Sequence, residues 1–268
     1  MNPDMNDKTR RILRYAELDS TMDEARRLLA AGLEDGSVIL ADRQSSGRGR
    51  IAGRAWEAEE GSSLLMTMVI GRESARATAL PLRIGLAVRR MAGTLANGSG
   101  ALGGSGASGG DADVFRLKWP NDLVASTASG WRKIAGILCE STDGRVLAGV
   151  GINLRPQTFA PELADKAAAL TDVIGIGPES LPDIAALAAA LAEDIDYALV
   201  DMEWRDRINE CLWMRGEMVE FTEGHPERGI RHRGRIEGVD AEGCLLLREN
   251  GGGLKSYASG ELSGFVPG

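Results

Sequence analysis

The spacing of hydrophobic residues along the chain predicts three helices. The first begins at a capping box formed by Thr21 and Glu24, continues with apolar residues on one face, and stops at Gly32. The second covers residues 80–95, and the third is an alanine-rich segment over 181–204. Short apolar runs predict strands at 37–41, 63–70, 115–119, 133–140 and 145–154. This order of elements indicates an α/β (α+β) fold in which helices flank a mixed β-sheet.

The pattern changes after Trp213. Short candidate strands separated by glycine follow one another at 217–221, 231–239, 244–248 and 254–258, which is typical of a small all-β barrel. We therefore expect a larger domain over residues 1–215 and a small β-barrel domain over 216–268. Glycine and serine dominate residues 97–110, so we expect a flexible surface insertion there.

Composition narrows the class of protein. Hydrophobic residues make up 43% of the chain and charged residues 26%, with a net charge of -8, which excludes a wholly disordered chain and disfavours generic binding of nucleic acid or anionic membrane. Three widely spaced cysteines form neither a disulfide framework nor a zinc motif. The N-terminus has no apolar signal segment, and no apolar stretch is long enough to span a bilayer. We therefore expect a cytoplasmic protein.

Arginine and glycine alternate in a loop that follows the first predicted strand. Residues 43–56 contain four arginines and three glycines. Glycine lets backbone amides approach a ligand, and arginine holds carboxylate or phosphate groups through paired hydrogen bonds. A solvated basic loop is the alternative, but a basic cluster in an acidic chain favours an anion site.

Three further motifs carry candidate chemistry. Asn121 and Asp122 follow a predicted strand, where they can hold a ribose, a base edge or Mg²⁺, or simply form an Asx turn. Lys133 begins an apolar strand and either reaches out to solvent or places a point charge in a pocket. Gly149 and Gly151 interrupt a strand, which often marks the close approach of a ligand or of another backbone segment.

Together, and in this order, the motifs resemble those of the biotin protein ligase family. The matching residues are Asp19-Ser20-Thr21, Gly47-Arg48-Gly49-Arg50 with Gly53-Arg54 and Trp56, Lys118-Trp119-Pro120-Asn121-Asp122, Lys133 with Ala135-Gly136-Ile137, and Gly151-Ile152-Asn153. The resemblance is strong over residues 15–156. It is weaker in the tail, where Gly216-Glu217 and Gly260-Glu261-Leu262 resemble the family's SH3-like C-terminal domain.

The resemblance implies an enzyme of the biotin–[biotin carboxyl-carrier protein] ligase type, with residues 1–215 as its catalytic domain. Such enzymes join biotin to ATP, release pyrophosphate and form biotinyl-5′-AMP. They then transfer biotin to a lysine of the biotin carboxyl carrier domain of a carboxylase. The implied cofactors are ATP and Mg²⁺, with Mg²⁺ held through the ATP phosphates rather than by a metal motif, and biotin is the substrate.

The resemblance also implies a role for each site residue. The catalytic residues are Lys133, at the biotin carboxylate and the α-phosphate, and Arg50. The biotin-binding residues are Ser20, Thr21 and Gln44 at the ureido ring, Arg48, Gly49 and Arg50 in a closing loop, and Lys133, Gly136 and Gly151. The nucleotide-binding residues are Trp56, Asn121, Asp122 and Asn153. An anhydride formed from two anions requires positive charge at the reacting phosphorus, which Arg50 and Lys133 would supply.

Two features depart from the family pattern. One extra residue lies between Arg50 and Gly53, at Ile51-Ala52, and residues 97–110 look like an insertion. The match begins near Tyr15, which leaves only about a dozen residues before it, too few for a winged helix. We therefore expect the short class without an N-terminal DNA-binding domain, with no nucleic-acid or membrane partner, as a monomer or homodimer. We also expect the loop over 45–55 to be mobile without ligand, because its arginines repel one another.

Two rival functions remain. One is a lipoate or octanoyl ligase of the same fold. The combination of the arginine loop with the motif at 118–122 favours biotin as the substrate over lipoate or octanoate. The other is a non-catalytic ligand-binding adaptor, against which the presence of Lys133 and Arg50 weighs.

Overall fold

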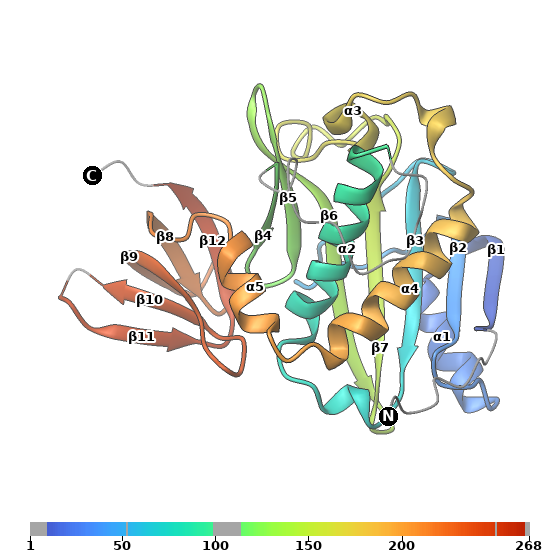
Figure 1. The fold of residues 1–268 in the computed structure, drawn as a ribbon, viewed down its shortest axis with the longest axis horizontal. Helices are drawn as coiled ribbons and strands as arrows, with labels where there is room; N and C mark the ends of the chain where they lie inside the picture. Colours follow the sequence, from blue (N-terminus) through green and yellow to red (C-terminus); the bar gives the residue numbers. More distant parts are fainter. Residues whose placement is uncertain (1–9, 52, 99–113, 250, 266–268) are drawn as a thin grey trace.

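A seven-stranded mixed sheet forms the larger part of the protein (Figure 1). The structure, a computed structural model, describes residues 10–51, 53–98, 114–249 and 251–265. The sheet has the order β1-β2-β3-β7-β6-β5-β4, in which β1 and β2 are parallel and all other neighbours are antiparallel. Its strands are β1 (Ile12–Leu18), β2 (Val38–Gln44), β3 (Ser63–Ile70), β4 (Phe115–Lys118), β5 (Asp122–Thr127), β6 (Gly130–Thr142) and β7 (Arg145–Asn153). The expected mixed sheet with flanking helices is confirmed.

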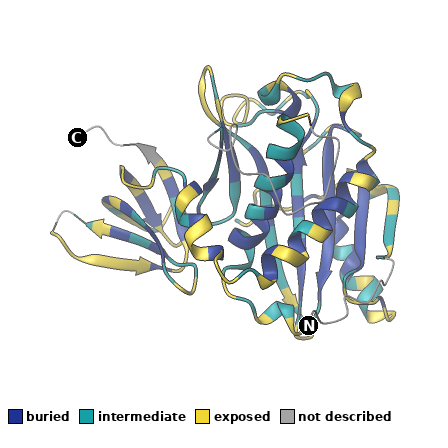
Figure 2. Ribbon diagram, in the orientation of Figure 1, coloured by how far each residue is buried: buried dark blue, intermediate teal, exposed yellow. Residues whose placement is uncertain are grey.

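Helices cover the two faces of this sheet unequally. On one face, α4 (Ile184–Val200) packs against β2 and β3, and α2 (Leu80–Ala96) packs against β4, β5 and β6. Val38 and Leu40 of β2 belong to the core on this face. On the other face, α1 (Thr21–Ala30) packs against Ile39 of the same strand, because successive side chains of a strand point to opposite faces. The interior strand β3 is buried along its whole length (Figure 2), which explains its largely apolar sequence.

The first helix begins differently from the prediction. Ser20 is its N-cap, and no side chain caps the backbone there. The capping box of Thr21 and Glu24 was therefore wrong, because the Thr21 hydroxyl is instead bonded to Gln44 and Thr67. The predicted stop is confirmed, since α1 ends at Ala30 and Gly32 has a φ of 90°.

The single helix predicted over 181–204 is two helices. The first, α4, starts after Asp183, whose Oδ1 accepts a hydrogen bond from the Ala185 amide at 2.8 Å. Asp201 then leaves the helical conformation, with ψ at 117°, and its side chain accepts a bond from the Glu203 amide. This local bond competes with helix continuation, so α5 (Trp204–Cys211) starts as a separate helix.

Two strands and three short helical segments were not predicted from the sequence. The edge strand β1 is largely polar, and β5 begins only four residues after β4 ends, so neither was predicted. Short helical segments complete the larger part: η1 (Ser74–Arg76), α3 (Leu170–Ile174) and η2 (Pro178–Ser180). The predicted insertion at 97–110 falls outside the described residues except for Asn97, the C-cap of α2, and Gly98, which follows it.

The C-terminal strands form an antiparallel sheet of order β11-β10-β9-β8-β12. They are β8 (Met218–Glu223), β9 (Ile230–Val239), β10 (Leu245–Glu249), β11 (Leu254–Tyr257) and β12 (Gly260–Phe265), of which β12 was not predicted. In the ranges that the structure describes, no pairing joins β11 to β12, so the sheet is open and the expected closed barrel was not found. The domain boundary at 215–216 stays a prediction.

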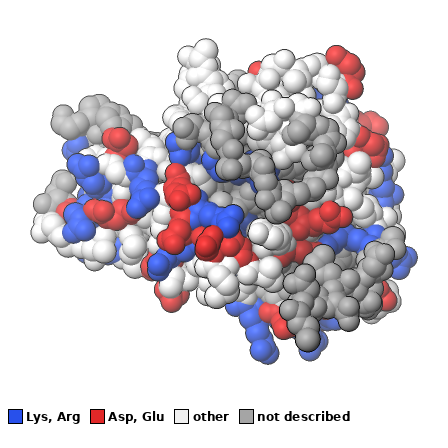
Figure 3. Space-filling model, in the orientation of Figure 1, with Lys and Arg blue, Asp and Glu red and all other residues white. Residues whose placement is uncertain are grey.

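The C-terminal sheet packs against the end of β4. The Trp119 ring lies 5.9 Å from the Phe221 ring, and its Nε1 donates to the Gly243 carbonyl at 3.0 Å. Acidic and basic side chains are interspersed over the face shown in Figure 3. None of the helices within the described residues is long and apolar enough to cross a membrane.

Candidate active site

One row of residues runs straight across the sheet on the face that α1 covers only in part. Directly paired residues of neighbouring strands point to the same face. The register gives the row Ala41, Leu65, Gly151, Gly136, Asp122 and Lys118, from β2 to β4. Because Gly151 and Gly136 are adjacent, the middle of the row is a flat platform without side chains. We call this pair the glycine platform.

A β-bulge brings Lys133 onto this face. Lys133 and Gly136 are three residues apart, so regular alternation would place them on opposite faces. The register shifts between Leu123, which pairs with Ala135, and Val124, which pairs with Lys133. Ile134 is therefore the extra residue of the bulge, and such bulges re-aim side chains. The Lys133 ammonium consequently forms an ion pair with Asp122 Oδ1 at 2.7 Å.

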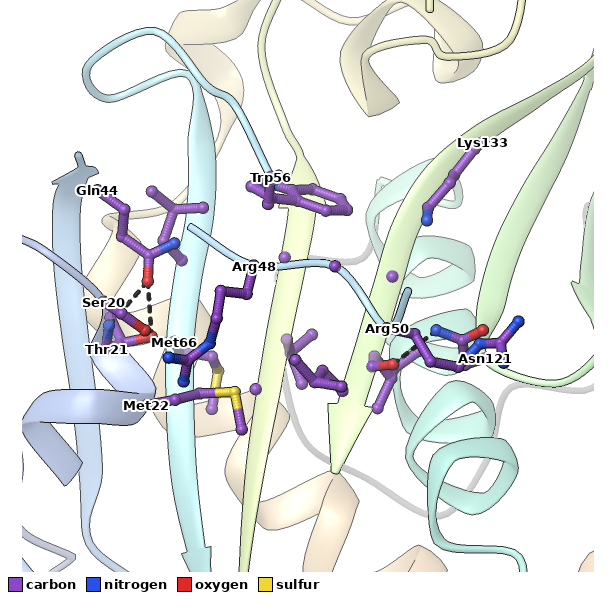
Figure 4. A pocket seen from close by; sticks show the side chains of 18 residues that line it. Ser20, Thr21, Met22, Gln44, Arg48, Arg50, Trp56, Met66, Asn121 and Lys133 are labelled. Atoms are coloured by element: carbon purple, nitrogen blue, oxygen red, sulfur yellow. Dashed lines mark hydrogen bonds between the residues drawn. The ribbon is translucent and has the colours of Figure 1, made fainter. Parts of the chain in front are cut away.

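Polar groups from α1 and β2 close one end of the pocket. Gln44 Oε1 accepts hydrogen bonds from the Thr21 amide at 2.8 Å and the Thr21 hydroxyl at 3.0 Å. With its oxygen engaged, Gln44 presents its amide nitrogen toward the pocket (Figure 4). Ser20 is a buried residue that lines the pocket, and its hydroxyl does not cap α1. This end therefore offers a donor and a hydroxyl to a polar ligand group.

The arginine loop folds into a small hairpin over the pocket. The Gly49 amide donates to Arg54 at 2.8 Å, and the Trp56 amide donates to Gly47 at 3.0 Å. A Cβ on Gly47 would lie 2.4 Å from the Trp56 carbonyl oxygen, so this crossing requires glycine. Ala52, one of the two residues at the extra loop position, lies outside the described residues.

Each arginine of the hairpin has a protein partner. Arg48 holds Asp23 of α1 through two hydrogen bonds of 2.8 and 2.9 Å. Arg50 donates to the Gly260 carbonyl at 2.9 Å, and Arg54 pairs with Glu261 at 3.0 Å. The expectation that repulsion between these arginines dominates was wrong, because carboxylates from distant segments pair with Arg48 and Arg54, and Arg50 donates to a backbone carbonyl. Mobility of the loop without ligand stays a prediction.

Electrostatics support the contact between the loop and α1. Burial by itself raises the pKa of Asp23, but hydrogen bonds and charge from Arg48 and Arg26 outweigh it and hold that pKa below its ordinary value. In return, the hydrogen bond to Asp23 raises the pKa of Arg48. The pair is therefore fully ionised at neutral pH.

Trp56 lies on the glycine platform. A Cβ on Gly151 would stand 2.5 Å from Trp56 Cε2, and one on Gly136 would stand 3.0 Å from Cζ3. The Lys133 ammonium lies 5.4 Å from the indole centroid, a cation–π distance. Within the described part of the chain, the buried Trp56 Nε1 has no hydrogen-bond partner, so a bound ligand could supply an acceptor.

The pocket brings together most of the predicted site residues. Those that line it are Ser20, Thr21, Gln44, Arg48, Gly49, Arg50, Trp56, Asn121, Lys133, Gly136 and Gly151. Figure 4 shows Gln44 at one end, Lys133 at the other and Trp56 between them. The cavity measures about 60 Å³, far less than the roughly 300 Å³ of small-molecule sites.

Two predicted residues do not line this cavity. Asp122 reaches it only through its ion pair with Lys133. Asn153 is buried on the same face, two residues beyond Gly151, and its amide oxygen accepts from Gln157 at 3.2 Å. Asn121 does line the cavity, where its side-chain nitrogen donates to the Ile137 carbonyl at 2.8 Å.

Sequence analysis missed several lining residues. Met22 Sδ would stand 2.9 Å from a Cβ on Gly149, so the methionine packs on a third glycine beside the platform. The glycine-interrupted strand was the available signal for this contact. Five further residues also line the cavity: Leu65, Met66, Ile137, Leu138 and Val150. Nothing distinguishes them in sequence from core residues.

In the described ranges, no cluster of three or more His, Cys, Asp or Glu side chains could hold a metal.

Comparison with known proteins places the chain in a family. The family model described as "Biotin/lipoate A/B protein ligase family" matches residues 15–156. The bifunctional ligase/repressor BirA of Bacillus spizizenii is 30% identical over 273 residues, covering 90% of this chain and 70% of the relative. The biotin–[acetyl-CoA-carboxylase] ligase of Mycobacterium tuberculosis is 31% identical over 195 residues, covering 71% of this chain and 64% of the relative.

A solved structure shares the fold over most of both chains. The biotin protein ligase from Aquifex aeolicus in complex with biotin and ATP superposes with a TM-score of 0.74 at 25% identity, covering 94% of this chain and 97% of that one. The match therefore includes the C-terminal sheet as well as the mixed sheet and its pocket. The chain belongs to the biotin/lipoate A/B protein ligase family.

Proposed function

We propose that this protein is an ATP-dependent ligase that activates biotin as biotinyl-5′-AMP and transfers it to a lysine of a biotin carboxyl carrier domain. The observation that carries the proposal is the pocket's polarity. A neutral polar end at Ser20 and Gln44 is joined by an apolar glycine platform to a cationic end at Lys133. Biotin has the same sequence of groups: a ureido ring, an aliphatic chain and a carboxylate.

We infer a task for each end of the pocket from its polarity. The Gln44 amide and the Ser20 hydroxyl would bind the ureido group, and Arg48 would close the loop over it. The carboxylate oxygen would then attack the α-phosphorus of ATP beside Lys133, and pyrophosphate would leave. Lys133 and Arg50 would stabilise the negative charge that develops there. No protein nucleophile is needed, because the substrate carboxylate is itself the nucleophile.

The nucleotide would lie on the side of Trp56 and Asn121. The indole offers a stacking surface and the unpaired Nε1 donor, while Asn121 retains its side-chain oxygen as an acceptor. Asp122 is a carboxylate next to this position, and Mg²⁺ is typically held by one or two carboxylates together with substrate phosphates. Asp122 therefore fits a Mg²⁺ ion that arrives with ATP, where the ion would neutralise phosphate charge.

Closure of the loop would exclude water from the adenylate until transfer. In the second step the carrier lysine amine attacks the acyl carbon and AMP leaves.

The open C-terminal sheet would be the counterpart of the family's SH3-like domain, and it supplies loop contacts at Gly260 and Glu261. We place the enzyme in the cytoplasm, where carboxylases and their carrier domains are made.

The polar end of the pocket argues against the nearest rival. A lipoyl or octanoyl group has no hydrogen-bonding atoms to place against Ser20 and Gln44, and unpaired buried polar groups cost about 1–3 kcal/mol each. A lipoate ligase with this pocket would therefore discriminate against its own substrate.

The test is acid-dependent exchange of labelled pyrophosphate into ATP. Biotin, lipoate and octanoate are supplied in parallel at equal concentration. We expect exchange with biotin and little with the other two acids. Exchange that responds best to lipoate or octanoate would establish the rival ligase, and exchange with none of the three would indicate a ligand-binding adaptor.

A further inference from the structure

One polar side chain lies inside the buried and largely apolar strand β3. Thr67 is the only polar residue between Leu64 and Ile70, and it is fully buried. It lies opposite Ile39 of β2 and Gly149 of β7, on the face of the sheet that α1 covers. Thr67 is not among the residues that line the pocket, so any effect it has on a ligand must pass through another side chain.

Thr67 begins a series of hydrogen bonds that ends at the pocket. Its hydroxyl donates to the Thr21 hydroxyl at 2.8 Å, and the Thr21 hydroxyl donates to Gln44 Oε1 at 3.0 Å. The Thr21 backbone amide donates to the same oxygen at 2.8 Å. The series therefore joins three elements, because Thr67 belongs to β3, Thr21 to the first turn of α1 and Gln44 to the end of β2.

The donor and the acceptor of each of these bonds are fixed by chemistry. A backbone N–H can only donate, so the Gln44 atom that faces Thr21 must be the oxygen and not the nitrogen. The single hydroxyl proton of Thr21 then points at Gln44, which leaves the Thr21 oxygen free to accept the proton of Thr67. Gln44 therefore directs its nitrogen, a donor, toward the pocket (Figure 4), and the ligand group that fits this end is an acceptor.

On the basis of the proposed function, in which biotin is the ligand, we propose that Thr67 is a positioning residue. Acting through Thr21, it holds the Gln44 amide nitrogen toward the ureido oxygen of biotin. The torsion that turns a glutamine amide has a broad range, so the amide needs hydrogen bonds to keep one orientation. Without Thr67 the Thr21 hydroxyl would be free to rotate away from Gln44, and only the Thr21 backbone amide would remain to hold the Gln44 oxygen.

The competing explanation is structural. A hydroxyl buried in an apolar strand requires a hydrogen-bond partner, and Thr21 would then serve only to satisfy Thr67. In that case removal of the Thr67 hydroxyl would change the stability of the protein and not its affinity for biotin, since both bonds between Thr21 and Gln44 would persist. Thr67→Val separates the two explanations, because it removes the hydroxyl and keeps the branched shape of the side chain.

The test measures the Kd for biotin by isothermal titration calorimetry without ATP. Thr67→Val is compared with Thr67→Ser, which keeps the hydroxyl, and with Thr171→Val, a matched control at a buried threonine whose Oγ1 has no hydrogen-bond partner within the described residues. We expect Thr67→Val to raise the Kd by about 5- to 20-fold, the effect of one lost hydrogen bond at a buried site. Thr67→Ser and Thr171→Val should bind biotin as the parent protein does. In a Gln44→Ala background, Thr67→Val should have no further effect.

A second measurement reports on Gln44 without any ligand. The chain has two glutamines, Gln44 and Gln157, so selective ¹⁵N labelling of glutamine gives two side-chain amide groups in an NMR spectrum. Gln157 is the internal reference. We expect the Gln44 side chain to be more mobile in Thr67→Val than in the parent protein, seen as a lower heteronuclear NOE, with Gln157 unchanged.

The outcomes separate the claims. An unchanged Kd for biotin in Thr67→Val would overturn the proposal in favour of the structural role, and so would an equal loss of affinity in the Gln44→Ala background. Thr67→Ala removes the same hydroxyl with a smaller side chain, so it provides the same test if Thr67→Val does not fold. If the unmodified protein does not bind biotin, the proposed function fails, while unchanged mobility of Gln44 in the Thr67 variants would separately overturn the positioning role.

Discussion

Replacement of Gly151 by alanine tests whether the glycine platform positions the loop. The added Cβ would stand 2.5, 2.7 and 2.9 Å from Cε2, Cζ2 and Cδ2 of Trp56, whereas ordinary contact begins at 3.4 Å. The indole must therefore move by about 0.9 Å, the difference between 3.4 and 2.5 Å. Backbone hydrogen bonds of the hairpin would pass this shift on to the segment that carries Arg48 and Arg50.

A shift of this size has a large kinetic effect and a small effect on stability. Misplacement of reacting groups by 1 Å can cost on the order of 100-fold in rate. We therefore expect kcat/KM for biotin-dependent pyrophosphate exchange to fall by roughly that factor in Gly151→Ala. The free energy of unfolding should change little, because the tryptophan lies on a surface hairpin rather than in the core.

The assay measures exchange at varied biotin and ATP, with thermal unfolding in parallel. Gly93→Ala is the matched control, since a Cβ there meets nothing within 4 Å and the helix gains about 1 kcal/mol from alanine. In a Trp56→Ala background the Gly151→Ala change should have little further effect, because the clashing ring is gone. Wild-type kcat/KM in Gly151→Ala would refute the reasoning, and so would an equal loss in the Trp56→Ala background.

Three further predictions concern the rest of the site and the insertion. Lys133→Ala should reduce adenylate formation by about 100- to 1,000-fold with an unchanged Tm, and formation at the parental rate would remove Lys133 from the mechanism. Arg50→Gly should release biotinyl-AMP into solution, because it loses the bond to Gly260 that holds the loop closed; no increase in free adenylate over the parent protein would contradict this. Replacing residues 97–110 with a short Gly-Ser connector should leave Tm nearly unchanged, since loop closure costs only about 0.6 kcal/mol per doubling of length, whereas a drop of many degrees would show that the segment packs.

Local patterns in the sequence predicted the core of the fold well. The strand β3 was identified because burial on both faces leaves an almost wholly apolar run. The strand that contains Gly151 was identified from the apolar residues around its glycines. The strand β1 was missed because an edge strand retains polar residues. The break after Val200 was missed because it depends on one side-chain bond of Asp201, and helical propensity on both sides hides it.

The sequence motifs predicted most residues of the site, but they did not predict the contacts between residues that are far apart along the chain. The bulge at Ile134 that turns Lys133 toward Asp122 exists only in the pairing of β5 with β6, so no local pattern reports it. The partners of Arg48 and Arg54 lie 25 and 207 residues away along the chain. Such contacts form only on folding, so no local pattern in the sequence reports which carboxylates pair with the arginines of the loop.

The measurement that tests the central claim most directly is biotinylation of a purified apo biotin carboxyl carrier domain, followed by mass spectrometry. The reaction contains this protein, biotin, ATP and Mg²⁺, and the control carrier has its acceptor lysine replaced by arginine. The proposed function predicts a mass increase of one biotinyl group on the carrier, located at that lysine, which requires ATP and is absent from the control. An unmodified carrier under conditions in which an established biotin ligase modifies it fully would contradict the assignment.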